Sequence, residues 1–189
     1  MTDIDVFIGY ENCLKSLKEI SQDTENQEYM TNSEYMLLDF DSVKQEYTRR
    51  LSRSYTVCKS CDGLSWKNTY KVLVEFKNGD FTNNEIKDKI QASLLLLCDI
   101  ADTHISKTRE ELDFILVYNE AAKPLTDNRK ELLVQESSSR VEIGQSLGRL
   151  AGTPLIRFDL EKYQGFYFKH VLTLTGEEFD AWFNEKFVS

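Results

Sequence analysis

Apolar side chains recur at the three- and four-residue intervals of a helix in two long stretches of the chain. The first stretch is 9–20, and the second is 84–102, for which Asn83 or Asn84 is the expected N-cap. Both patterns predict amphipathic helices that bury one face against the rest of the protein. The apolar stripe of the second stretch comprises Ile86, Ile90, Leu94, Leu97 and Ala101.

Two more helices are marked by the residues at their starts. Ser42 is followed three residues later by Gln45, which has the form of a capping box and predicts a helix over 42–52. Thr175 and Glu178 have the same arrangement and predict a last helix in the chain. Further helical patterns are present at 106–111 and 126–150.

Short apolar runs without helical spacing predict the strands. In the run 70–77 the middle positions are apolar on both faces, which is typical of a central strand, and Asn78-Gly79-Asp80 then ends it. The polar residues 21–34 are expected to form a mobile loop. Other strands are expected at 54–61, 114–118 and 155–158, with a further candidate at 165–171.

This order of helices and strands predicts an α/β (α+β) protein in which a mixed central β-sheet is flanked by helices. No repeat and no linker rich in proline and glycine divides the chain, so residues 1–189 are expected to form a single domain. Its parts are an acidic N-terminal helix and loop (1–41), a core (42–118) and C-terminal helices and strands that complete the sheet (119–189).

The composition excludes several classes of protein. A hydrophobic fraction of 41% and a charged fraction of 29% are ordinary for a globular protein and exclude a mostly disordered chain. The longest apolar run, near 94–97, is far too short to cross a bilayer. The first residues lack the basic and apolar regions of a secretory signal, so a cytoplasmic protein without membrane contact is expected.

Charge is unevenly distributed along the chain. The net charge is −9, yet residues 44–89 carry ten lysines and arginines against six aspartates and glutamates. A cationic segment inside an acidic chain favours a local site for an anion such as phosphate.

The residue types that suit phosphodiester chemistry occur at Asp62, Glu75 and Lys77. Because side chains alternate along a strand, Glu75 and Lys77 lie on the same face of the strand 70–77. Asp62 follows the expected strand 54–61 and joins them if the two strands pair. Two carboxylates near one point favour a hard cation such as Mg²⁺ or Mn²⁺, and a nearby lysine can position an attacking water molecule.

These residues resemble the motif of the PD-(D/E)xK nuclease superfamily, whose core has the order helix, strand, strand, strand, helix, strand. Asp62 matches the first acidic position, and Glu75-Phe76-Lys77 matches the Glu-x-Lys that follows. The proline that often precedes the aspartate is replaced here by Cys61. The resemblance implies that Asp62 and Glu75 bind a metal ion and that the protein hydrolyses nucleic acid in restriction, repair or defence. DNA is favoured as the substrate, but the sequence does not decide between DNA and RNA.

The resemblance covers residues 42–118 and implies supporting residues around this centre. The family often has a glutamate on the preceding helix, where Glu46 is suitably placed. Many members also use a polar residue from the following helix. Lys87 and Gln91 are four residues apart and share a helical face, so either suits this role. Members of the family also form homodimers or act with protein partners, which would supply a binding surface that this acidic chain lacks.

A non-catalytic interaction protein is the competing hypothesis. Residues 1–41 carry a net charge of −8 and would form the contact surface for a basic partner, as in an immunity protein or a nuclease inhibitor. The position of the charges in space separates the two hypotheses. A nuclease needs Asp62, Glu75 and Lys77 to converge in a cleft with basic walls, whereas an inhibitor needs a broad acidic face.

The stretch around Asp39 and Asp41 is similar to the first motif of haloacid-dehalogenase-type phosphatases, in which an apolar strand precedes Asp-x-Asp. That resemblance would make Asp39 the nucleophile and Asp41 the acid/base. The later lysine and acidic pair of that family are not found convincingly, and Asp41-Ser42 is better explained as a helix start.

An aromatic run near the end of the chain has two interpretations. Aromatic side chains can stack on bases, but they more often fill a hydrophobic core, and the core is the favoured interpretation here. The run consists of Tyr163, Phe166, Tyr167 and Phe168.

Overall fold

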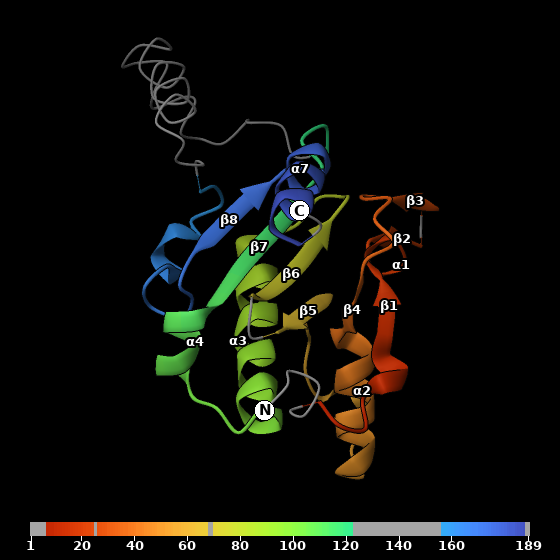
Figure 1. Cartoon of the computed structure of the whole chain (residues 1–189), viewed down its shortest axis with the longest axis vertical. Helices are drawn as coiled ribbons and strands as arrows, with labels where there is room; N and C mark the ends of the chain where they lie inside the picture. The colour runs from red at the N-terminus through yellow and green to blue at the C-terminus, as the bar shows by residue number, and fades with distance from the viewer. Residues whose placement is uncertain (1–6, 25, 68–69, 123–155, 188–189) are drawn as a thin grey trace.

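The computed structural model describes residues 7–24, 26–67, 70–122 and 156–187. A six-stranded mixed sheet with the strand order β1-β4-β5-β6-β7-β8 runs through its centre, and helices flank the sheet (Figure 1). This arrangement confirms the predicted α/β (α+β) class. The strands are β1 (Leu14–Ser16), β4 (Met36–Asp39), β5 (Gly63–Trp66), β6 (Lys71–Lys77), β7 (Leu112–Tyr118) and β8 (Val171–Leu174), and a separate pair is β2 (Gln22–Asp23) and β3 (Glu28–Tyr29).

Four longer helices and several short turns connect these strands. In the part of the chain that the structure describes, no helix combines the length and the apolar composition that crossing a bilayer requires. The helices and 3₁₀ turns are η2 (Glu11–Cys13), α1 (Leu17–Ile20), α2 (Phe40–Arg50), η3 (Tyr55–Val57), α3 (Asn83–Ile100), α4 (Ile105–Glu111), η4 (Glu161–Tyr163) and α7 (Gly176–Phe187).

The direction of each strand follows from the connection before it. Neighbouring strands from β1 to β6 are antiparallel, whereas β6, β7 and β8 are parallel to one another. A tight connection joins β5 to β6 as a hairpin, while α3 and α4 return the chain to the start of β7, as a parallel neighbour requires.

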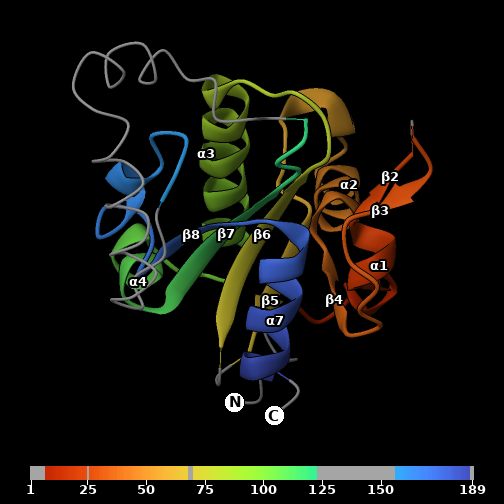
Figure 2. The ribbon, with the colours of Figure 1, turned by 90° about the horizontal axis from the view of Figure 1, so that it is seen from above.

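The alternating side chains of β6 contribute to two separate cores. Leu73 packs in the core under α2 and α3, whereas Val72 and Val74 pack in the core under α1 and α7. Figure 2 shows α3 and α7 on opposite faces of the sheet. Glu75 shares the face of Leu73 and is therefore directed toward the α3 side.

The strongest sequence patterns correspond to observed elements. The expected strands 70–77 and 114–118 and the expected helices 84–102, 106–111 and 42–52 correspond to β6, β7, α3, α4 and α2. The last helix is also confirmed as α7, and the predicted capping interactions between Thr175 and Glu178 are present at its start.

Two helix starts differ from the prediction. Thr82, and not one of the two asparagines, caps α3, because its hydroxyl and the Glu85 carboxylate exchange hydrogen bonds with each other's backbone N–H groups. Asp39, and not Ser42, caps α2, because its carboxylate accepts hydrogen bonds from the backbone and hydroxyl of Ser42. In both cases the helix begins after the residue whose side chain accepts a hydrogen bond from a free backbone N–H group of the first turn.

The helix expected over 9–20 is wrong. This segment forms η2, β1 and the four-residue α1, and β1 pairs antiparallel with β4, with Leu14 opposite Leu38. Pairing with a distant strand at the sheet edge outweighs the helical spacing of the apolar residues. The expected loop 21–34 contains the short β2–β3 hairpin.

The strand expected over 54–61 is also wrong. The segment forms η3, which begins where the Ser54 hydroxyl accepts a hydrogen bond from the Thr56 backbone N–H at 3.3 Å. The strand β5 begins later, at Gly63, and all of its residues are buried. Asp62 therefore lies immediately before the strand that pairs with β6.

The end of the chain contains one strand in place of the two short ones that were expected. Residues 156–158 lie outside any strand, and residues 165–170 form a turn that is closed by a bridge between Gln164 and Phe168. Regular pairing begins at Val171 in β8, beside β7. The helix expected over 126–150 lies outside the described residues.

Gly176, at the start of α7, packs directly against a distant segment of backbone. A Cβ atom on Gly176 would lie 2.6 Å from the carbonyl oxygen of Met30. Gly176→Ala is therefore expected to lower the free energy of unfolding by ~1–3 kcal/mol in urea titrations, because the backbone must shift to relieve the overlap. Gly79→Ala is the matched control, since no atom lies within 4 Å of the added carbon. Equal effects of the two variants would contradict the close approach.

Candidate functional site

The β5–β6 hairpin places Asp62 and Glu75 side by side. Gly63 is opposite Val74 in this antiparallel pair, and the next positions along the two strands are Asp62 and Glu75. The backbone N–H of Asp62 donates to the carbonyl oxygen of Val74 at 3.0 Å. Its carboxylate Oδ2 accepts from the backbone N–H of Phe76 at 2.6 Å, which fixes the side chain against β6.

Lys77 reaches the same point from the end of β6. Its Nζ lies 3.3 Å from Oε1 of Glu75, as expected for residues two positions apart on one face of a strand. Glu75 is fully buried, while the side chain of Lys77 is 22% exposed. The three residues chosen from the sequence, Asp62, Glu75 and Lys77, therefore converge.

Lys89 from α3 completes the cluster. Its Nζ lies 2.7 Å from Oε1 of Glu75 and 3.1 Å from Oδ1 of Asp62, so one ammonium group contacts both carboxylates. The sequence prediction missed this residue. Lys89 occupies a position of the buried stripe, three residues after Ile86, and a charged side chain there was the available signal.

The supporting residues implied by the family resemblance have no contact with Asp62 or Glu75 among the contacts of the described residues. Lys87 and Gln91 lie two positions before and after Lys89 and therefore point to another side of α3. Glu46, on α2, forms ion pairs with Arg49 and Arg50, and these hydrogen bonds lower its pKa to about 2.

Burial dominates the electrostatics of the cluster. Burial, followed by the nearby charge of Asp62, raises the pKa of Glu75 to about 8, against the opposing effect of Lys89 and Lys77. Burial also raises the pKa of Asp62, against the attraction of Lys89. For Lys89, burial disfavours the charged form, but the two carboxylates outweigh it and raise its pKa.

The two carboxylate oxygens of Glu75 have different surroundings. Oε1 lies 2.7 Å from Nζ of Lys89 and 3.3 Å from Nζ of Lys77. Oε2 has no hydrogen-bond donor among the described residues. A buried carboxylate oxygen without a donor is costly for a fold, and such groups are concentrated at functional sites.

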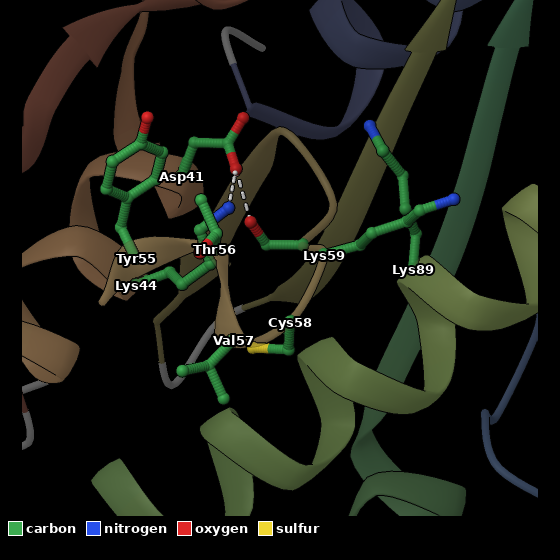
Figure 3. A pocket seen from close by; sticks show the side chains of 9 residues that line it. Asp41, Lys44, Tyr55, Thr56, Val57, Cys58, Lys59 and Lys89 are labelled. Carbon is green, nitrogen blue, oxygen red and sulfur yellow. Dashed lines mark hydrogen bonds and ion pairs between the residues drawn. The ribbon is translucent and has the colours of Figure 1, made fainter. Parts of the chain in front are cut away.

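A pocket lined by three lysines, Lys44, Lys59 and Lys89, is shown in Figure 3. Lys89 connects it to the carboxylates, because its ammonium group contacts both Asp62 and Glu75. The volume of the pocket is about 480 Å³, and α2, the segment around η3 and α3 surround it. Lys44 and Ser60 both contact Asp41 on one side of the pocket, and Lys89 also lines it. The lining residues are Asp41, Lys44, Tyr55, Thr56, Val57, Cys58, Lys59, Ser60 and Lys89.

The residues of the alternative phosphatase motif do not form a common site. Asp39 caps α2 and pairs with Lys15, whereas Asp41 pairs with Lys44 and accepts a hydrogen bond from Ser60. Both carboxylates are therefore explained by structural contacts of their own helix start.

The metal-binding capacity of the described residues is small. No group of three or more His, Cys, Asp and Glu side chains in them is arranged to hold a metal ion. Asp62 and Glu75 would therefore supply two protein ligands, with water or a phosphate oxygen as the others. Comparisons with protein families, curated proteins and solved structures find no match for the chain. The site is thus interpreted from its own geometry.

Proposed function

We propose that this protein hydrolyses phosphodiester bonds of nucleic acid with the help of Mg²⁺ or Mn²⁺. The observation that carries the proposal is the convergence of Asp62, Glu75 and Lys77 on one point, next to a cationic pocket. Over residues 42–118 the chain runs through α2, the antiparallel strands β5 and β6, the helices α3 and α4 and the parallel strand β7. There is one strand fewer before α3 than the resemblance implies.

The residues present fit a magnesium or manganese ion. Mg²⁺ in enzymes is held by one or two carboxylates and retains several water molecules. Oε2 of Glu75 has no hydrogen-bond donor among the described residues, and Asp62 lies directly beside Glu75. A bound ion would stabilise the negative charge that develops on the phosphate and lower the pKa of a water molecule.

The lysines of the site have separate roles in this proposal. Lys77 donates hydrogen bonds from its ammonium group to the attacking water or to a phosphate oxygen. It can do so because the ammonium group lies beside Glu75 and the side chain is partly exposed. Lys59 lines the neighbouring pocket and attracts the phosphates of the substrate strand, whereas the charge of Lys44 is compensated by Asp41. The cationic walls favour the nuclease over the acidic interaction protein.

Lys77→Ala is expected to reduce metal-dependent cleavage by ~10²–10⁴-fold, because the variant loses the donor that positions water. Cleavage is measured on mixed DNA and RNA substrates with Mg²⁺ or Mn²⁺ and again after chelation. The control is Lys87→Ala, which removes an exposed lysine of α3 on another side of the helix. Retained cleavage in Lys77→Ala would remove this residue from the mechanism. Absence of both cleavage and metal binding in the unaltered protein would overturn the proposed function.

A further inference from the structure

Lys89 holds the position that a cation bridging Asp62 and Glu75 would take. A single nitrogen atom lies 3.1 Å from an oxygen of the first carboxylate and 2.7 Å from an oxygen of the second. These two side chains are the ones assigned to the metal ion in the proposed function. An ammonium group and a metal ion cannot occupy the same space between them.

The contacts of Lys89 differ from those of a purely structural buried ion pair. Such pairs persist when further hydrogen bonds satisfy the remaining oxygen atoms. Here Oε2 of Glu75 has no partner among the described residues, and Oε1 is contacted only by lysine ammonium groups. The carboxylate pair therefore retains the capacity to bind a stronger cation.

The side chain of Lys89 can also adopt a second conformation, directed into the pocket. It is 19% exposed and lines the pocket that contains Lys44, Lys59 and Ser60. A lysine side chain has four rotatable bonds, and its ammonium group can leave the carboxylates without movement of the helix. With a doubly charged ion between the carboxylates, repulsion would drive the ammonium group toward the pocket, where substrate phosphate would attract it.

We propose that Lys89 is a displaceable internal cation, which fills the metal position in the metal-free protein and moves into the pocket when a divalent ion binds. The inference rests on the proposed function, because it takes Asp62 and Glu75 as the metal ligands. It makes Lys89 a competitor of the metal ion and, once displaced, a third lysine facing the phosphate of the substrate strand.

Metal binding without substrate tests the competition directly. Lys89→Met removes the charge and keeps the unbranched stem, and calorimetric titration with Mn²⁺ should show at least ~10-fold tighter binding than in the unaltered protein. Lys87→Met is the control and should leave the affinity unchanged, because this exposed lysine points to another side of α3. Circular dichroism establishes that each variant is folded.

A second measurement uses the unaltered protein and needs no variant. Reductive methylation with mass spectrometry reports how accessible each lysine ammonium group is. Mn²⁺ should increase the methylation of Lys89 several-fold and leave that of Lys87 constant. Labelling that stays constant or falls while Mn²⁺ binds would overturn the displacement of Lys89.

The outcomes separate this inference from the function on which it rests. Equal or weaker Mn²⁺ binding by Lys89→Met, with measurable binding by the unaltered protein, would overturn the role of Lys89 and leave the proposed function standing. Absence of Mn²⁺ binding in both proteins would overturn the proposed function as well. Tighter binding by Lys89→Met together with increased labelling of Lys89 supports the inference.

Discussion

Glu75→Gln is expected to stabilise the metal-free protein, and its advantage over the unaltered protein should grow as the pH rises from 5 to 9. Burial, followed by the charge of Asp62, raises the pKa of Glu75 from 4.5 to about 8 in the folded state. Between these values the folded protein keeps a proton that the unfolded chain has lost, so stability falls as the pH rises through this range. Glutamine does not ionise, and the variant should be more stable above pH 8 by at least ~2 kcal/mol.

Urea unfolding at pH 5.5 and pH 9 in the presence of a chelator measures this difference. Glu85→Gln is a control with the opposite sign. Hydrogen bonds from the backbone N–H and hydroxyl of Thr82 lower the pKa of Glu85. The neutral amide of glutamine accepts these hydrogen bonds more weakly than a carboxylate, so the variant should be slightly less stable at both pH values. A constant difference between Glu75→Gln and the unaltered protein across the pH range would show that the carboxylate is not held in its neutral form.

Phe168→Ala should lower the free energy of unfolding by ~3–5 kcal/mol. Phe168 is fully buried and stacks on Phe114 of the central strand β7, with ring centroids 5.1 Å apart. Truncation removes this contact and leaves a cavity that the surrounding strands cannot close. Urea unfolding at constant pH measures the change.

Phe166→Ala is the matched control from the same aromatic run. Its side chain is 56% exposed, so its replacement should alter the free energy of unfolding by less than about 0.5 kcal/mol. A similar cost for both variants would mean that the whole run is part of the core. The expected contrast would show that Phe168 is part of the core and Phe166 is not, although the two residues are neighbours in the sequence.

Local patterns predicted the elements at the centre of the fold. The apolar run of β6 and the stripe of α3 are each long enough to specify one type of structure without help from distant residues. The errors occur at 9–20 and 54–61, where pairing with β4 and a 3₁₀ turn, respectively, replaced the expected element. At 9–20 pairing with a distant strand decided the conformation, whereas at 54–61 a local hydrogen bond from Thr56 to the Ser54 hydroxyl begins the turn.

The residues of the candidate site also divide into those that local sequence patterns predicted and those that only the packing of the fold placed. Glu75 and Lys77 were predictable, because alternation along one strand is enough to bring them together. Asp62 joins them through β5, which follows it, and not through the expected strand 54–61, which does not form. Lys89 was not predicted, because its contact with the carboxylates depends on how α3 is rotated against the sheet. Glu46 pairs instead with Arg49 and Arg50 on its own helix.

Residue type and short-range periodicity were therefore sufficient for the fold class, the central elements and the shared face of Glu75 and Lys77. The packing of helices on the sheet determined the burial of Glu75, the absence of a donor to its Oε2 among the described residues and the insertion of Lys89. These properties depend on which surfaces exclude water and which charges meet across elements far apart in the chain. No local pattern of residues encodes that information, because it arises only when the layers are assembled.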